Sequence, residues 1–282
     1  MRRGATTGVS CGLRASVSGV SLVLRRLLPA LVVLGVLLAA CGAPAAPTLT
    51  DPDEILAQGL EATANLKTFH LELSLDGRVT DPGSGSTFPL SGTSIEGDFD
   101  LQNQRIAATF SAMGFAGDLR LVDGASYLKM SLTGPQWIRS DIDPGASGDP
   151  MGAVTDPAAA IAELRTFLER DGVEAALEAD GSCDDRPCYH VVLTVSAELL
   201  DAAAAEQGGT ATVPSELLPD GLEVDLFFDK EKRYLSRVAL DLAGSEVGDV
   251  SAVLTLSDVD EPVDVEAPPA DEVTDGEGLP FP

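Results

Sequence analysis

The chain has 282 residues, with 45 acidic and 18 basic side chains, and its formal net charge is −27. This acidity argues against a nucleic-acid partner, because phosphates are held by Lys and Arg. No D-x-[DN]-x-[DN]-G calcium loop accompanies the acidic residues, so a solvated acidic surface is the simpler interpretation.

The first 40 residues have the pattern of an export signal. An apolar, uncharged run over 27–40 follows two arginines, and it is too short for a membrane-spanning helix, which needs about 20 residues. Small residues stand directly before Cys41, as in the lipobox where bacteria attach a diacylglyceride to the thiol. We expect a lipoprotein signal peptide over 1–40 and a lipidated Cys41; an ordinary signal peptide that happens to contain a cysteine is the alternative.

Removal of this leader makes the chain more acidic. Taking its five arginines from the 18 basic residues leaves 13 against 45 acidic residues, a net charge of −32. Anionic headgroups would repel such a body, so acyl chains rather than a basic patch would hold it at the membrane. We expect a protein that is lipid-anchored to the cell membrane on its extracytoplasmic face.

The segment after the anchor predicts a tether followed by a helix and a strand. Residues 41–50, rich in Pro and Ala, form the expected tether. Asp51 and Pro52 then have the positions of a helix cap and a first helical residue. From Phe69 to Asp76 apolar and polar residues alternate, which is typical of a half-buried strand.

Four more alternating runs, at 91–102, 104–113, 116–123 and 125–132, are separated by tight turns that favour antiparallel pairing. A Gly/Pro/Asp loop up to Thr155 precedes a second helix that starts at Asp156, and its apolar stripe is expected to lie on the sheet.

Two strands near 173–180 and 187–195 flank Cys183 and Cys188. An even cysteine pair in an exported protein predicts a disulfide, which would contribute roughly 2 kcal/mol. A metal site joining both thiols to His190 is the less favoured alternative, and we expect neither a metal nor a cofactor. A third helix follows Ser196, then three strands, and an acidic tail over 269–282 is expected to be disordered.

These elements predict an α+β fold: one large curved antiparallel sheet, a half-barrel of about ten strands, with about three helices on its concave face. Residues 51–268 would form this single domain. Apolar residues on one face of the strands, and on the second helix, are the candidates for lining a cavity: Leu71, Leu73, Phe99, Leu101, Ile106, Phe110, Leu119, Leu121, Leu128, Met130, Ile161, Leu164, Phe167 and Leu168. Each could instead be ordinary core.

Catalytic signatures do not emerge from the sequence. Only His70 and His190 could act as a base, and both fall opposite the apolar strand face. The nucleophile-elbow, P-loop, dinucleotide and zinc-protease motifs are missing. We therefore expect no enzymatic activity and no catalytic residues.

Four segments, in this order and spacing, resemble the mycobacterial LppX/LprG-type lipoproteins, which are related in fold to the carriers LolA and LolB. They are Leu66–Leu71, Gly124–Leu132 with Gly134–Trp137, Tyr189–Ala197, and Leu254–Val265. The resemblance covers about Asp53 to Pro268. It implies a half-barrel whose hydrophobic pocket takes the acyl chains of a lipid or acylated glycolipid in transit across the envelope, with an envelope transporter as a conceivable partner. The cysteine hairpin and the strong negative charge depart from the family pattern.

The resulting hypothesis is a membrane-anchored lipid binder or carrier. The alternative is a tethered structural or adaptor lipoprotein with a filled core that docks an envelope partner. An apolar hollow left between the curved sheet and its helices would separate the two.

Overall fold

The computed structural model describes residues 47–80, 85–141, 157–206, 218, 221–242 and 248–276. The residues from 48 onward belong to one compact unit, Thr48–Pro282. The predicted signal peptide and Cys41 lie outside the described residues, as do most of the loop before Thr155 and the last six residues.

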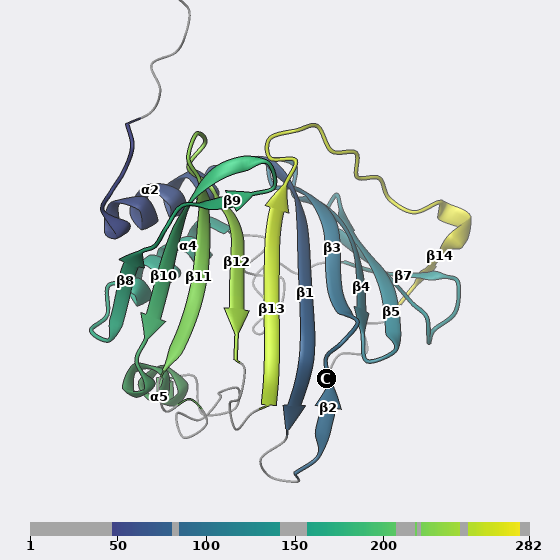
Figure 1. Ribbon diagram of the computed structural model, residues 1–282. Helices are drawn as coiled ribbons and strands as arrows, with labels where there is room; N and C mark the ends of the chain where they lie inside the picture. The colour runs from purple at the N-terminus through teal and green to yellow at the C-terminus, as the bar shows by residue number, and fades with distance from the viewer. Residues whose placement is uncertain are drawn as a thin grey trace, which may run out of the picture. The chain divides into compact units, whose positions relative to one another are not determined.

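In the part of the chain that the structure describes, fourteen strands form one open, mostly antiparallel sheet, which Figure 1 shows. The strands are β1 (Thr68–Thr80), β2 (Thr87–Pro89), β3 (Thr93–Asp100), β4 (Arg105–Ala112), β5 (Phe115–Val122), β6 (Ala125–Met130), β7 (Trp137–Asp141), β8 (Val173–Leu177), β9 (Gly181–Cys183), β10 (Arg186–Val195), β11 (Leu222–Asp229), β12 (Leu235–Asp241), β13 (Gly248–Ser257) and β14 (Val273–Asp275). Their order is β14-β7-β6-β5-β4-β3-β1-β13-β12-β11-β10-β8, with β2 on β1 and β9 on β10.

The centre of the sheet joins the first long strand to the last. β1 pairs with β13 from His70 to Val79 and with β3 from Thr68 to Leu75. Because β1 is paired on both sides, its alternating residues are fixed in register, and a slip by one residue would turn its leucines to the opposite face.

Two tight turns have the backbone that their sequences predict. Met113-Gly114 joins β4 to β5, Asp123-Gly124 joins β5 to β6, and all four residues have positive φ angles between 48° and 86°. Two successive positive φ angles give the type I′ turn, whose twist matches antiparallel strands.

The described residues include three α-helices, α2 (Pro52–Ala64), α4 (Pro157–Leu168) and α5 (Ala197–Glu206). The Asp51 side chain caps α2 by accepting a hydrogen bond from the Asp53 amide at 3.0 Å, and Pro52 occupies its first turn. Both features stabilise the start of a helix, as predicted from the sequence.

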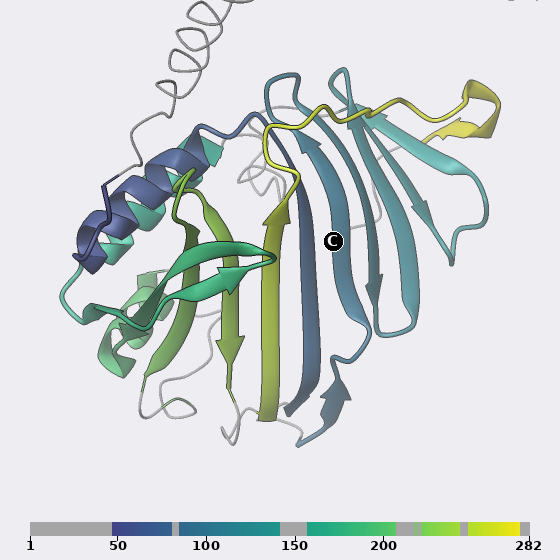
Figure 2. The same cartoon turned by 45° about the horizontal axis from the view of Figure 1, so that its top comes forward.

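Helix α2 lies on one side of the curved sheet, and β14 lies at the opposite border of the sheet (Figure 2). The buried Ile55 and Leu56 of α2 pack with Val191 of β10 and Leu226 of β11. Helix α4, which we expected to lie on the sheet, packs mainly against α2, and its last residue, Leu168, also packs against the core around Val191 and Leu226.

The close packing of α2 depends on Gly59. A Cβ atom at this position would lie 2.2 Å from the ring of Phe228, which is fully buried on β11. The absence of a side chain therefore lets the helix approach the sheet.

The predicted α+β class and curved sheet are confirmed, but the sheet has more strands than the ten expected. The short β2, β9 and β14 were not predicted, and β7 continues the Gly-Pro-Gln-Trp segment. The tail differs from the expected disorder: residues 270–272 form the 3₁₀ turn η2, and β14 pairs in parallel with β7. Its last residues lie outside the described chain.

The expected tether is also shorter than predicted. Leu49 is buried in the core beneath α2, and its amide donates a hydrogen bond to the Tyr189 hydroxyl at 2.9 Å. The compact unit therefore begins before Asp51.

Candidate functional site

An apolar row crosses nine neighbouring strands on one face of the sheet. It runs through Val191, Leu226, Val238, Leu254, Leu73, Ile95, Phe110, Gly117 and Met130, each directly opposite the next. Residues opposite each other on paired strands point to the same side. We call this side the concave face, because α2 packs on it at Val191 and Leu226.

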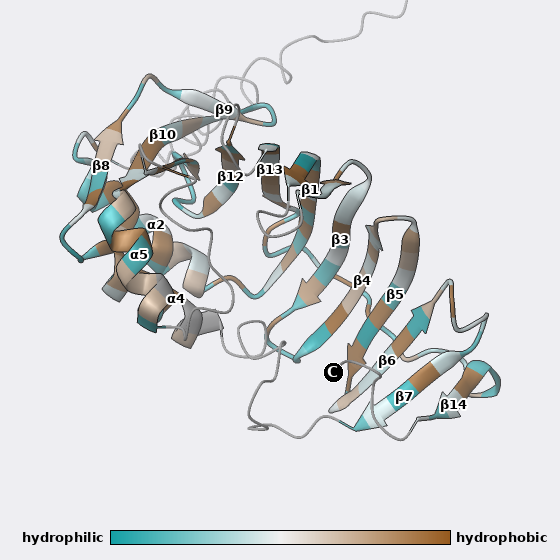
Figure 3. Ribbon diagram, turned by 90° about the horizontal axis from the view of Figure 1, so that it is seen from below, coloured by the Kyte–Doolittle hydropathy of each residue, from teal (hydrophilic) through white to brown (hydrophobic). Residues whose placement is uncertain are grey.

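Helices cover this face only in part. Figure 3 shows α2, α4 and α5 gathered near β8 and β10, whereas no helix of the described chain stands before β3, β4 or β5. Burial follows this arrangement: Val191 is 0% exposed and Ile95 is 39% exposed. The apolar row thus passes from a packed core beneath α2 to a surface that the described residues leave partly open.

The open end of this face carries a further large side chain. Phe115 begins β5 opposite Ala112, and its alternation with Gly117 and Leu119 places it on the concave face. It is 47% exposed. Together with Ile95, which is 39% exposed, it adds to the apolar surface that the described residues leave uncovered on the concave face.

The structure brings the predicted strand candidates together on the concave face. Four of them are buried and act as core: Phe99, Ile106, Leu121 and Leu128. Five are partly exposed: Leu71, Leu73, Phe110, Leu119 and Met130. Leu101 follows β3 and packs against the buried group around Phe99.

The candidates on α4 lie apart from the exposed strands. Leu168 packs against the core beneath α2, whereas Leu164 is 41% exposed. Ile161 and Phe167 are half-buried. Since α4 rests on α2, these four residues do not line the open part of the concave face with the strand residues.

Sequence reasoning missed Ile95 and Phe115 as candidates. Ile95 lies in an alternating run, so its face could have been read from Phe99. Phe115 directly follows the Met113-Gly114 turn, and only the observed register assigns it to β5 and to the concave face.

The enclosed apolar cavity that the sequence predicts is not confirmed. A pocket of about 400 Å³ lies between β3 and β6, but its lining includes the polar Ser94, Thr109, Asp118 and Lys129. Thr109, Asp118 and Lys129 are in register with Glu96, on the face opposite the apolar row, and the lining also includes Phe110, Gly117 and Met130 of that row. Away from α2, the apolar row of the concave face is partly exposed along the described strands.

Both histidines lie on this opposite, outer face, as predicted. His70 contacts Asp98 across β1 and β3, with 2.8 Å between Nδ1 and Oδ1. His190 Nε2 lies 2.6 Å from Asp225 Oδ1, and its ring stacks on Phe227.

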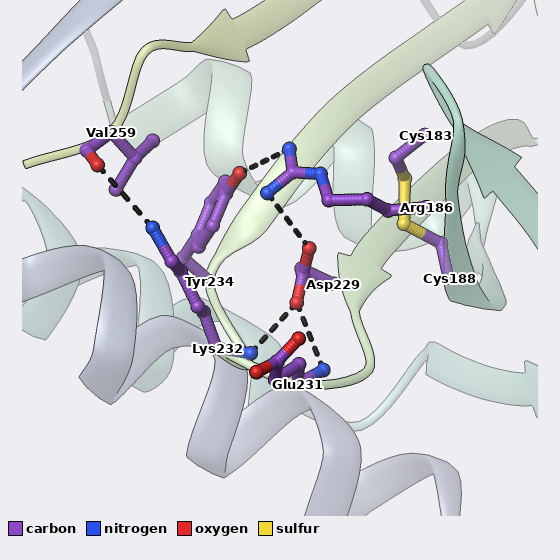
Figure 4. A network of polar contacts seen from close by, with 8 residues as sticks. All are labelled: Cys183, Arg186, Cys188, Asp229, Glu231, Lys232, Tyr234 and Val259. Carbon is purple, nitrogen blue, oxygen red and sulfur yellow. Dashed lines mark hydrogen bonds and ion pairs between the residues drawn. A yellow bond between two sulfur atoms is a disulfide. The ribbon is translucent and has the colours of Figure 1, made fainter. Parts of the chain in front are cut away.

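The predicted disulfide between Cys183 and Cys188 is present, with Cα atoms 5.8 Å apart. It occupies both thiols, so the alternative metal site with His190 is excluded. The disulfide closes the hairpin from β9 to β10, which carries Arg186 into a network of polar contacts (Figure 4).

This network stabilises the sheet at the point where β10 begins and β11 ends. The Arg186 guanidinium lies 3.1 Å from the buried carboxylate of Asp229 and donates to the Tyr234 hydroxyl at 2.6 Å. Asp229 also accepts from the amides of Glu231 and Lys232. A buried carboxylate needs such partners to offset its desolvation, and we assign this network a structural role. Burial also raises the pKa of Tyr234.

Solved structures provide a comparison for this fold. LppX from Mycobacterium tuberculosis is 17% identical, with 77% of this chain and 100% of LppX covered and a TM-score of 0.45. LprF from Mycobacterium bovis is 18% identical, with 77% and 96% covered and a TM-score of 0.48. A LolA-superfamily protein from Nitrosomonas europaea is 11% identical, with 76% and 95% covered and a TM-score of 0.26.

The predicted resemblance to this group of proteins is confirmed, and at these identities it concerns the fold alone. No protein-family model and no curated protein sequence matches the chain. Among the residues described, none of the helices has the length and apolar character to span a bilayer.

Proposed function

We propose that this protein binds the acyl chains of a lipid or glycolipid on its concave face and carries them within or across the cell envelope. A single observation carries the proposal: the apolar row that begins beneath α2 continues, partly exposed, to Ile95 and Met130. Soluble proteins rarely leave such continuous apolar surface without a partner.

The proposed process is lipid transfer without an enzymatic step. Moving acyl chains from one apolar environment to another changes their free energy little, because both environments keep the chains from water. We further propose that Cys41, lipidated after removal of the leader, anchors the protein on the extracytoplasmic face of the membrane. The lipid would then be passed to or from an envelope partner, and the acidic body would disfavour anionic headgroups.

Lipid extraction tests this function directly. Protein expressed without residues 1–41 cannot carry an acyl anchor, so any lipid found with it is a bound ligand. Native mass spectrometry should show added masses that disappear on denaturation, and organic extraction should recover an acylated molecule. Protein that is folded but free of lipid, and that takes up none from lipid vesicles, would favour the adaptor function instead.

A further inference from the structure

A cluster of potential metal ligands lies on the outer face of the two central strands. His70 and Glu72 are two residues apart on β1, and Glu96 stands directly opposite Glu72 on β3. The His70 Nε2 atom is 3.7 Å from Glu96 Oε1 and 3.9 Å from Glu72 Oε1. One ligand atom from each residue lies within 4.8 Å of the others.

Among the described residues, only one basic side chain forms ion pairs with the carboxylates of this cluster. Glu72, Glu96 and Asp98 surround one imidazole, and in the described chain His70 is the sole basic group within ion-pair distance of them. The residues opposite Glu72 on β13 and Glu96 on β4 are Thr255 and Thr109, which bring no charge. Like charges directly opposite on paired strands destabilise a sheet, so this position favours a bound cation.

Asp98 gives the cluster its orientation. It stands opposite His70 and holds the Nδ1 atom at 2.8 Å. In the neutral tautomer that donates its Nδ1 proton to Asp98, the other ring nitrogen, Nε2, faces the two glutamates with its lone pair available. A carboxylate that holds the remote nitrogen of a ligating histidine is the usual support of a zinc ligand, because it fixes the tautomer and the ring.

We propose that His70, Glu72 and Glu96 bind one divalent zinc ion, with Asp98 as the residue that orients His70. A zinc ion about 2.0–2.1 Å from each ligand atom, at tetrahedral angles, would separate those atoms by about 3.3 Å. The two separations from His70 Nε2, 3.7 and 3.9 Å, exceed this value by about 0.4 and 0.6 Å, and all the ligand atoms lie within 4.8 Å of one another, so the glutamate side chains must close in by at most about 1.5 Å. The glutamate side chains are 66% and 63% exposed, so they can make this movement and leave a fourth position open to solvent.

Calorimetric titration of zinc chloride into the full-length protein, purified in detergent, tests the site. We expect one zinc ion per chain. Glu72→Gln, Glu96→Gln and His70→Ala should each weaken binding by at least 100-fold, and Asp98→Asn by about 10–100-fold, as expected for a supporting carboxylate. His190→Ala removes the other histidine and should leave binding unchanged.

Two further measurements separate this site from nonspecific binding to an acidic protein. In the His190→Ala variant only the His70 imidazole remains, and zinc should shift the nitrogen NMR signal of its Nε2. Without zinc, Glu72→Gln should melt at the same or a higher temperature than the native chain, because it removes like-charge repulsion. Binding that survives in His70→Ala, or an Nε2 signal that does not move, would overturn the proposal.

Discussion

Replacement of Phe115 by serine should weaken lipid binding and leave the fold intact. Phe115 lies on the concave face at the open end of the sheet and is 47% exposed. Of a phenylalanine side chain of roughly 200 Å², about 90 Å² is then available to an acyl chain. At about 25 cal/mol per Å², covering this area contributes about 2 kcal/mol, or about 30-fold in Kd.

The assay is a fluorescence titration with a dansyl-labelled fatty acid, and the protein lacks residues 1–41. Val253→Ser is the matched control, because Val253 is a half-buried apolar residue of β13 that pairs with Ser74 on the outer face. It should bind as the native chain does. In thermal melts, the free energy of unfolding of Phe115→Ser should lie within about 0.5 kcal/mol of that of the native chain. Equal affinities of the Phe115 variant and the native chain would refute the assignment of the concave face.

Three predictions concern stability. Changing Cys183 and Cys188 together to alanine should lower the free energy of unfolding by about 2 kcal/mol in a denaturant titration, because the closed loop no longer restricts the unfolded chain; an unchanged midpoint would contradict this. Gly59→Ala should lower the free energy of unfolding by about 1–2 kcal/mol, because the alanine methyl group overlaps the Phe228 ring. This loss is expected although alanine favours helices, and a more stable variant would show that α2 can move. Tyr234 has a folded pKa above its usual value of 10.0, so the unfolded chain loses this proton first and stability should fall only above about pH 10. Tyr234→Phe should flatten that alkaline fall in pH-dependent melts, and equal slopes would exclude the effect.

Much of the fold follows from local patterns in the sequence. The alternation from Phe69 to Asp76 predicts β1 and its apolar face, and Asp123-Gly124 predicts a hairpin turn. These features depend on neighbouring residues, so a single sequence contains them. The orientation of His70 and His190 could be predicted for the same reason.

The features of the structure that the sequence does not predict depend on contacts between segments that are far apart in the chain. Leu49 is fixed by Tyr189, which is 140 residues away. β14 forms because the backbone of β7 is free to pair with it, and nothing in the acidic sequence around Val273 signals that partner. The exposure of Ile95 and Phe115 likewise depends on where the helices pack, which strand periodicity does not contain.

The pairing of β14 with β7 has a consequence for the behaviour of the protein in concentrated solution. A bare sheet edge is a template for another chain, and β14 occupies the backbone of β7 from Trp137 to Arg139. We therefore expect β14 to hinder edge-to-edge pairing of two chains at that border, and deletion of residues 269–282 should increase the formation of β-rich aggregates in concentrated solution.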